Sequence, residues 1–235
     1  MDGNGRWAQK QGLARNEGHR AGVRNVENIV NACRDLNVPF LTLYAFSAEN
    51  WNRPRLEVEA LMHLLEQFLK KQRGNLLENG IRLRVLGRLE EMPGRVRKQL
   101  EQTLADTAHF TDSNLSLALN YGSRTEVVDA VKSYALACQR GDVDPEKIDW
   151  ETFASHLYTA DLPDPDLVIR TSGEQRISNF LLLQSAYAEY LFPEKFWPEF
   201  GVEDLAAAIQ SYRQRERRHG KTGEQVKNER LTTQR

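Results

Sequence analysis

Cysteine, long apolar runs and net charge are all scarce in this chain of 235 residues. The two cysteines, Cys33 and Cys138, lie far apart in helix-like segments and match no metal-ligand spacing. No apolar run approaches the roughly 20 residues that a membrane-spanning helix needs. The polar, glycine-rich start also lacks the pattern of a signal peptide. We therefore expect a reduced protein in the cytoplasm.

Charge of one sign does not dominate the chain either. The 32 lysines and arginines nearly balance the 33 aspartates and glutamates, which leaves a net charge of −1. This balance argues against general nucleic-acid binding, which favours clearly basic domains. A hydrophobic share of 40% and a charged share of 28% are typical of an ordinary globular protein. The length fits one domain better than two.

Segments with strand patterns alternate with segments of helical spacing along the whole chain. Strands are predicted at 40–46, 81–87, 115–119 and 167–169, and helices at 18–37, 55–79, 93–109, 125–140, 149–158 and 202–218. This alternation predicts a single α/β domain with a mainly parallel sheet surrounded by helices. The tail 221–235 is polar, and we expect it to be disordered.

The first seven residues, MDGNGRW, hold one carboxylate, two glycines, a cation and an aromatic ring. Gly3 and Gly5 allow tight turns that aim backbone N–H groups at an anion. Arg6 offers a forked cation that suits phosphate oxygens, and a divalent metal would give Asp2 a reason to lie beside phosphates. The pattern indicates a phosphate site, although short clusters of this kind are more often plain turns.

Cations gather where the helix at 18–37 is expected to begin. They are Lys10, Arg15, His19, Arg20 and Arg24. Positive charge is not ordinarily favoured at a helix N-terminus, and an anionic ligand there would resolve the conflict. The alternative is a solvated basic face.

Two dense polar segments follow predicted strands, at 47–54 and 170–178. Ligands of open α/β sheets bind at the carboxyl ends of strands. Arg170, Arg176 and Ser178 are candidates for a diphosphate clamp, with structural pairing of Arg170 and Glu174 as the alternative. The first segment is interpreted in the same way, against a plain capped loop. The aspartates at 161–166 lie among prolines, so a loop is expected there rather than a metal-binding helix.

Five segments, taken in order, closely resemble the undecaprenyl diphosphate synthase family, also called cis-prenyltransferases or isoprenyl transferases. They are MDGNGRWA, the pair Arg15 and His19, YAFSAENWNRP, DLVIRTSGEQRISNF and AYAEYLF. The resemblance runs from Met1 to about Arg218, so we expect the catalytic domain to cover 1–220. It implies a single α/β domain with a parallel sheet, surrounding helices and a hydrophobic tunnel, acting as a homodimer.

The resemblance also implies residue roles. Asp2 matches the essential aspartate that works with Mg²⁺, and Glu189 matches the second metal-ligand position. The allylic diphosphate site is implied at Gly3, Asn4, Gly5, Arg6, Arg15 and His19, with Trp7 at its edge. The next substrate segment is Ser47, Ala48 and Glu49, followed by Asn50, Trp51 and Arg53. The isopentenyl diphosphate clamp is Arg170, Arg176, Ile177 and Ser178.

Members of the family condense isopentenyl diphosphate onto an allylic diphosphate, usually farnesyl diphosphate, and form new cis double bonds. Ionising the allylic diphosphate requires stabilisation of the departing anion, which Mg²⁺ and arginines provide electrostatically. The family assigns the proton acceptor to Asn50. Because a neutral amide is a poor base, the alternative is that Asn50 orients a diphosphate oxygen that takes the proton. No nucleophile–base pair is apparent, and no covalent intermediate is implied.

The implied product is a long polyprenyl diphosphate of the undecaprenyl type, a lipid-carrier precursor for cell-wall glycan synthesis, released with peripheral membrane contact. Its length depends on the tunnel volume, which Ala45 and the helical stripe from Leu61 to Leu69 are expected to limit, although that stripe is foremost a core-facing pattern. The alternatives are a short-chain or irregular cis-prenyl diphosphate synthase, or a non-catalytic partner subunit.

The sequence departs from the family pattern at three places. Members carry an apolar strand directly before the aspartate, and this chain begins at Met1 without it. Either the true start lies upstream or this is a compromised form, with a central part of the sheet lacking a member and Asp2 lacking its rigid support. Leu183 replaces a common tryptophan and Glu17 a common aromatic or apolar residue, changes that we expect to alter substrate fit only.

Overall fold

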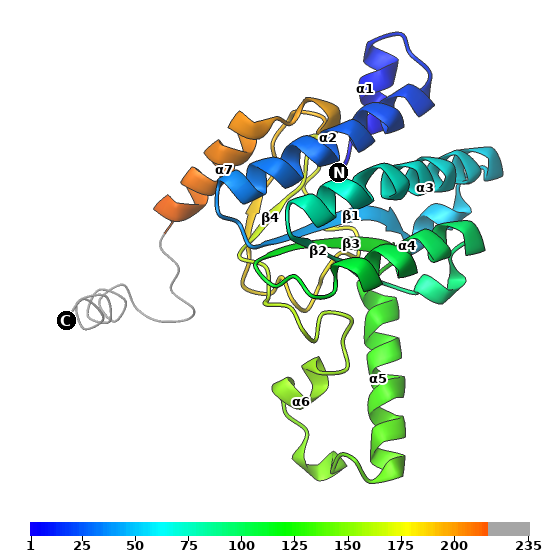
Figure 1. Cartoon of the computed structure of the whole chain (residues 1–235). Coiled ribbons are helices and arrows are strands. Elements are labelled where there is room, and N and C mark those ends of the chain that lie inside the picture. Colours follow the sequence, from blue (N-terminus) through cyan, green and yellow to red (C-terminus); the bar gives the residue numbers. More distant parts are fainter. Residues whose placement is uncertain (216–235) are drawn as a thin grey trace.

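The computed structural model describes residues 1–215. Helices α2, α3 and α4 lie along strands β1, β2 and β3, while α5 projects from the body with α6 beside it (Figure 1). The strands are β1 (Phe40–Ser47), β2 (Ile81–Leu86), β3 (Ser113–Tyr121), β4 (Leu167–Ile169) and β5 (Glu189–Leu191). The helices are α1 (Asn4–Lys10), α2 (Arg15–Asp35), α3 (Arg55–Glu78), α4 (Gly94–Thr107), α5 (Ser123–Arg140), α6 (Trp150–Ala154) and α7 (Val202–Gln214). The α/β class with parallel strands, predicted from sequence, is confirmed.

β3 is the centre of the larger sheet, with β1 and β2 parallel to it on either side. Leu115, Leu117 and Leu119 point into the core formed with α2, α3 and α4. Ala118 and Tyr121 belong to a second cluster on the other side, which Phe180 and Leu181 complete. A strand covered on both faces reads as a continuous apolar run, which explains why this one was recognisable in the sequence.

A second, two-stranded parallel sheet pairs β4 with β5. The two sheets are separate, and the consecutive residues 39–44 and 167–171 line a cavity of about 980 Å³. Because consecutive residues border it, the cavity runs along strand edges rather than along one row of side chains. That a central part of the sheet lacks a member stays a prediction.

Several predicted elements differ from the structure. Tight turns were expected at Gly3 and Gly5, yet Asn4–Lys10 is helical. Lys10 therefore belongs to α1 rather than to the helix that follows. The helix expected at 149–158 is only Trp150–Ala154, capped by the Asp149 carboxylate, which accepts from the Thr152 N–H at 2.8 Å. β5 was not predicted at all, because three residues are too few to show a period. Positions 216–218 of the last predicted helix and the tail 221–235 lie outside the described residues.

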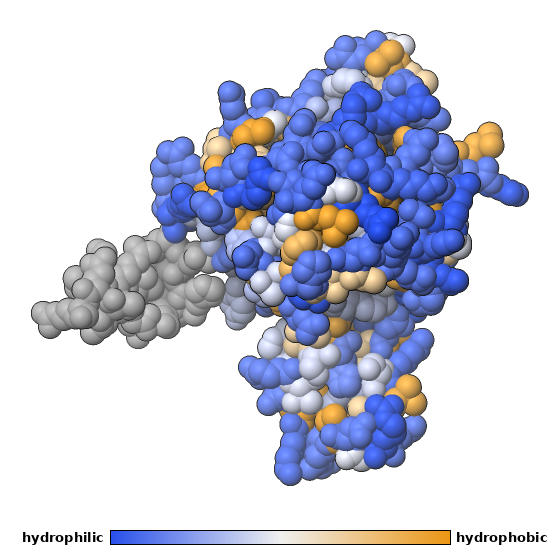
Figure 2. Space-filling view, in the orientation of Figure 1, coloured by the Kyte–Doolittle hydropathy of each residue, from blue (hydrophilic) through white to orange (hydrophobic). Residues whose placement is uncertain are grey.

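Helix α5 and the segment around α6 form a lobe with apolar side chains on its surface. Val128, Val131, Leu136, Ile148 and Trp150 are each between 46% and 53% exposed. Figure 2 shows apolar residues among hydrophilic ones on the visible face of this lobe. No helix in the described part of the chain is long and apolar enough to cross a bilayer.

Candidate active site

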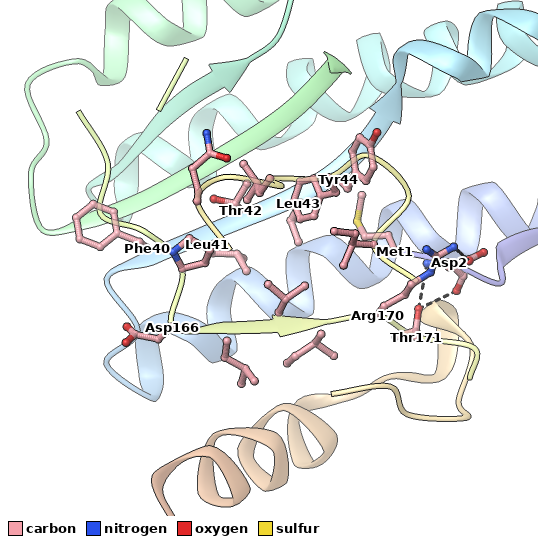
Figure 3. A pocket seen from close by; sticks show the side chains of 18 of the residues that line it. Met1, Asp2, Phe40, Leu41, Thr42, Leu43, Tyr44, Asp166, Arg170 and Thr171 are labelled. Atoms are coloured by element: carbon pink, nitrogen blue, oxygen red, sulfur yellow. Dashed lines mark hydrogen bonds and ion pairs between the residues drawn. The ribbon is translucent and has the colours of Figure 1, made fainter. Parts of the chain in front are cut away.

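Asp2 lies at the centre of the charged residues that the sequence singled out. Its Oδ2 accepts a hydrogen bond from Arg170 Nη2 at 2.9 Å, and its Oδ1 accepts from the Gly3 N–H at 2.6 Å. Arg6 Nη2 lies 3.4 Å from Oδ1. The predicted proximity of this carboxylate to Arg170, from the distant segment after β4, is therefore present in the folded chain (Figure 3).

The backbone of Asp2 is held firmly on both sides. Thr171 Oγ1 accepts from the Asp2 N–H at 3.0 Å and donates to the Asp2 carbonyl at 2.8 Å. The Trp197 N–H donates to the same carbonyl at 3.0 Å. The expectation that Asp2 lacks a rigid support is therefore wrong, because contacts with residues 171 and 197 supply it.

The surroundings of Asp2 favour its ionised form. Burial opposes ionisation, but hydrogen bonds from Arg170 and the Gly3 N–H, together with the charges of Arg170 and Arg6, outweigh it and lower the pKa of the carboxyl group. The Asp2 side chain remains about one-third exposed. An ionised oxygen that solvent can reach suits a cation that arrives with a ligand.

Gly3 starts α1 in a conformation that other residues rarely adopt. Its φ is 95°, and a Cβ there would lie 2.5 Å from Cδ1 of Phe196. Gly5 does not make the tight turn expected of it, because it lies inside α1. Its lack of a side chain instead lets the Arg15 guanidinium approach, since a Cβ would lie 3.1 Å from Arg15 Cζ.

A second group of cations surrounds Glu57, near the start of α3. Arg53 Nη1 lies 3.0 Å from Glu57 Oε1, and Arg15 Nη2 and His19 Nε2 each lie 3.6 Å from the same oxygen. Nε2 of His19 is buried and has no hydrogen-bond partner within the described residues. Three groups able to bind an anion therefore converge on one carboxylate.

His19 is held mainly in its neutral form. Burial lowers the pKa of its imidazole, and the charges of Arg53 and Arg15 act in the same direction, while Glu57 opposes them. An anion bound among these groups would reverse the balance, because negative charge stabilises the imidazolium. His19 is therefore poised to take up a proton with an anionic ligand.

The Arg170 guanidinium connects Asp2 to the predicted clamp. Its Nη1 donates to Ser178 Oγ at 2.7 Å and also to the Arg176 carbonyl, while Nη2 holds Asp2. The alternative pairing of Arg170 with Glu174 does not occur. Glu174 instead binds Arg176 and accepts from Arg6 Nη1 at 2.8 Å, so it links the first motif to the clamp.

The segment after β1 forms a short 3-10 helix, Ala48–Asn52. Asn50 caps it, because its Oδ1 accepts from the Ser47 N–H at 3.1 Å. Trp51 donates to Asn120 Oδ1 at 2.8 Å and packs edge-on against Phe46, which anchors the segment to the sheet. Glu49 Oε1 accepts from Asn179 at 2.7 Å. This segment thus borders both cation groups through Arg53 and Asn179.

The cavity between β1 and β4 opens at these residues. Asp2, Asn50, Arg53, Arg170 and Ser178 line it, as do Ser47, Glu49, Arg176 and Ile177. Its deeper wall is largely apolar and includes Leu41, Leu43, Ile169, Trp197 and Phe200. Figure 3 shows Met1 and Asp2 between the ends of β1 and β4. The arginines at the Asp2 end of the cavity suit an anionic ligand.

The predicted tunnel lining is not the lining of this cavity. Ala45, Leu61 and Leu65 pack against the main core, where Phe68 and Leu69 are buried. The core-facing interpretation of the α3 stripe is therefore confirmed, and its role in limiting the length of the product stays a prediction.

Residues 1–220 match the family described as "Putative undecaprenyl diphosphate synthase". An isoprenyl transferase from Heliobacterium mobile is 50% identical over 220 residues, which cover 94% of this chain and 85% of the relative. This chain belongs to the undecaprenyl diphosphate synthase family. A second isoprenyl transferase, from Chlorobaculum tepidum, is 48% identical over 227 residues, covering 97% of this chain and 86% of that protein. The chain is accordingly a prenyl-transferring enzyme.

Solved structures of this family have the same fold. Lavandulyl diphosphate synthase from Lavandula x intermedia, in complex with dimethylallyl diphosphate, gives a TM-score of 0.91 at 34% identity, covering 94% of this chain and 95% of the other. A probable undecaprenyl diphosphate synthase from Campylobacter jejuni gives 0.76 at 32% identity, covering 86% and 93%.

Glu189, which the family pattern pairs with Asp2 as a metal ligand, lies elsewhere in this chain. It begins β5 opposite Leu167, whereas Arg170 and Asp2 lie beyond the other end of β4. Its Oε2 accepts from Arg215 Nη1 at 2.6 Å. One copy of the chain therefore does not bring Glu189 and Asp2 together.

Among residues 1–215, no group of three or more histidine, cysteine, aspartate or glutamate side chains could hold a metal. Mg²⁺ is commonly bound through one or two carboxylates together with substrate phosphates and waters. Asp2, ionised and surrounded by candidate diphosphate-binding arginines, fits that second kind of site.

Three residues important to the site were not selected from sequence. Glu57 lies in a helix interpreted only as amphipathic, and Glu174 and Asn179 lie among residues selected for their cations and hydroxyl. A carboxylate three to five residues from a phosphate-binding motif is a weak sequence signal of a role in the site. The role can be recognised only in the structure, where cations from distant segments contact the carboxylate.

Proposed function

We propose that this enzyme condenses isopentenyl diphosphate with an allylic diphosphate, farnesyl diphosphate in the first instance, in a Mg²⁺-dependent reaction that yields a long polyprenyl diphosphate of the undecaprenyl type. The carrying observation is the group in which Arg170 joins the ionised Asp2 to Ser178, because a carboxylate beside a forked cation is what a diphosphate bound with a divalent metal needs.

Each cation group suits one diphosphate. Arg15, His19 and Arg53 are proposed to hold the allylic diphosphate, with Glu57 keeping them together in its absence. Arg170, Arg176 and Ser178 are proposed to hold isopentenyl diphosphate. Preorganised cations stabilise the negative charge that develops as the allylic C–O bond breaks.

Mg²⁺, bound through Asp2 and substrate oxygens, would supply further stabilisation of the departing diphosphate. Attack of the isopentenyl double bond on the allylic carbocation forms the new bond, and a proton is then lost. Asn50 Oδ1 is engaged with the Ser47 N–H, which leaves the amide Nδ2 as a donor. This arrangement favours Asn50 as the group that orients a diphosphate oxygen, with that oxygen taking the proton.

A homodimer is part of the proposal. The exposed apolar residues of α5 and the α6 segment form a surface that a second copy could cover. Sedimentation equilibrium of the wild type and of Val131→Glu provides the test. A dimer that dissociates in the variant supports the proposal, and a monomeric wild type contradicts it.

The second candidate function is a short-chain or irregular cis-prenyl diphosphate synthase. Its support is the TM-score of 0.91 to lavandulyl diphosphate synthase, whereas the identity of 50% to an isoprenyl transferase favours the first candidate. Incubation with labelled isopentenyl diphosphate, Mg²⁺ and either farnesyl or dimethylallyl diphosphate distinguishes them by chromatographic product length. Long product from farnesyl diphosphate supports the proposal. Short product alone supports the second candidate, and no extractable label from folded protein contradicts both.

A further inference from the structure

Asn179 contacts two segments that are distant in the sequence. Its Nδ2 donates to Glu49 Oε1 at 2.7 Å, in the segment after β1. Its Oδ1 accepts from the Arg124 N–H at 2.9 Å, and its carbonyl accepts from the Ser123 N–H at 2.8 Å. The family pattern described above assigns no role to this residue. One side chain thus joins the clamp loop to both α5 and the segment of Glu49.

Asn179 completes the N-terminus of α5 from outside the helix. The N-cap of α5 is Gly122, which has no side chain to accept from the first N–H groups. Unsatisfied N–H groups at a helix start need acceptors, and Asn179 supplies two. A Cβ on Gly122 would lie 2.6 Å from Asn179 Nδ2, so the glycine permits this approach.

The clamp loop adopts its shape at some conformational cost. Ser178 and Asn179 have φ values of 49° and 61°, a region in which asparagine is found more often than most residues. Such conformations persist only where surrounding contacts hold them. The contacts of Asn179 therefore fix the neighbouring Ser178, whose Oγ accepts from Arg170.

The resulting chain of contacts runs from Glu49 through Asn179 and Ser178 to Arg170, and from there to Asp2. Glu49 is kept ionised: burial works against it, but the hydrogen bond from Asn179 and other contacts outweigh burial and lower its pKa. A charged acceptor makes this hydrogen bond stronger than a neutral pair.

We propose that Asn179 is a positioning residue, an inference that rests on the proposed function. It holds the Arg170–Ser178 clamp at a fixed place relative to the segment of Glu49. Its amide is engaged by Glu49 and by the Arg124 N–H, so the proposed role acts through Ser178 and Arg170. Its contribution is to keep the isopentenyl diphosphate site in register with the allylic site.

Asn179→Asp separates this role from simple capping of α5. An aspartate keeps an oxygen for the Arg124 N–H but places a carboxylate against Glu49. We expect KM for isopentenyl diphosphate to rise about tenfold, as the loss of a charge-assisted hydrogen bond predicts, with KM for the allylic substrate changed less. The second variant combines Asn179→Asp with Glu49→Gln, which exchanges donor and acceptor across the same contact. Its KM for isopentenyl diphosphate should return to within about threefold of the KM of Glu49→Gln alone.

Binding of inorganic diphosphate, measured by calorimetry on the same four proteins, makes the outcome independent of turnover. Lack of turnover in the wild type would count against the proposed function and leave the binding comparison to decide this inference. Rescue of KM or affinity by the double substitution supports it. Equal KM and equal diphosphate affinity for Asn179→Asp and wild type would overturn the proposal, as would a double variant without rescue. Asn179 would then be only a structural cap of α5.

Discussion

Arg170 Nη2 lies 2.9 Å from Asp2 Oδ2, joining the first turn of the chain to the loop after β4. The same guanidinium donates to Ser178 and to the Arg176 carbonyl. One arginine therefore determines the relative positions of the carboxylate and the clamp. Its planar fork is needed for this, because the partners lie in different directions.

Arg170→Lys tests the importance of the fork. Lysine keeps the charge but cannot hold Asp2 and Ser178 at once in the same geometry. We predict that KM for isopentenyl diphosphate rises about tenfold or more, the equivalent of one charge-assisted hydrogen bond, and that the melting temperature changes little. Steady-state kinetics with each substrate varied in turn measures this. An unchanged KM would mean that charge alone is sufficient.

Gly18→Ala tests the close packing of α1 on α2. A Cβ at Gly18 would lie 2.0 Å from the Asn4 carbonyl oxygen. We predict a loss of about 1–3 kcal/mol in the free energy of unfolding, typical of overpacking, and weaker diphosphate binding because α1 carries Arg6. Urea denaturation and calorimetry measure the two effects.

Gly74→Ala is the matched control for that substitution. Gly74 is also inside a helix, α3, but nothing lies within 4 Å of its added Cβ. We predict that the free energy of unfolding rises by about 0.5–1 kcal/mol, because alanine is the better helix former. Equal destabilisation by the two alanines would contradict the packing argument.

His19 predicts a pH dependence of both stability and binding. Because its pKa is lowered by folding, its contribution to stability is present above pH 6.5 and is lost as the pH falls below that value. Bound diphosphate should raise this pKa, so binding is accompanied by the uptake of a proton. Calorimetry of inorganic diphosphate binding in two buffers of different ionisation enthalpy counts the protons.

His19→Asn is the control for that count. The variant lacks the titrating group, so its proton uptake should be smaller than that of the wild type by up to one proton. Equal uptake in both proteins would place the titration on another group or on the ligand.

The cavity along β1 and β4 predicts that an added strand stabilises the protein. Met1 lies at one end of this cavity. An apolar segment of about six residues fused before Met1 can pair with both edges, and we predict a higher melting temperature, with each 1 kcal/mol giving about 2–4 °C. The same segment with a central proline cannot complete the ladder. Identical melting of the two fusions would show that the cavity does not accept a strand.

Much of the architecture could be predicted because its signals are local. β1 and β3 are compact apolar runs, and α3 shows a long apolar stripe. The helix at Asn4–Lys10 could not be recognised, since its glycines signal a turn and its stability comes from packing on α2.

The charged residues of the site were recognised more readily than their partners. Arg170, Arg176 and Ser178 followed a strand and were selected for that reason. Glu57 and Asn179 act only through contacts with residues far away in the chain, which sequence spacing does not reveal. The same limit applies to Glu189, whose position at the far end of β4 depends on strand register.

Turnover of Asp2→Asn tests the central claim most directly. The substitution keeps the size of the side chain and an oxygen for the Gly3 N–H, but it removes the charge that Mg²⁺ and Arg170 require. Initial rates of labelled isopentenyl incorporation, at saturating substrates and Mg²⁺, should fall by about 10²-fold or more, with the melting temperature within a few degrees of the wild type. A variant that retains most of the wild-type rate would contradict the assignment of Asp2 as the centre of the site.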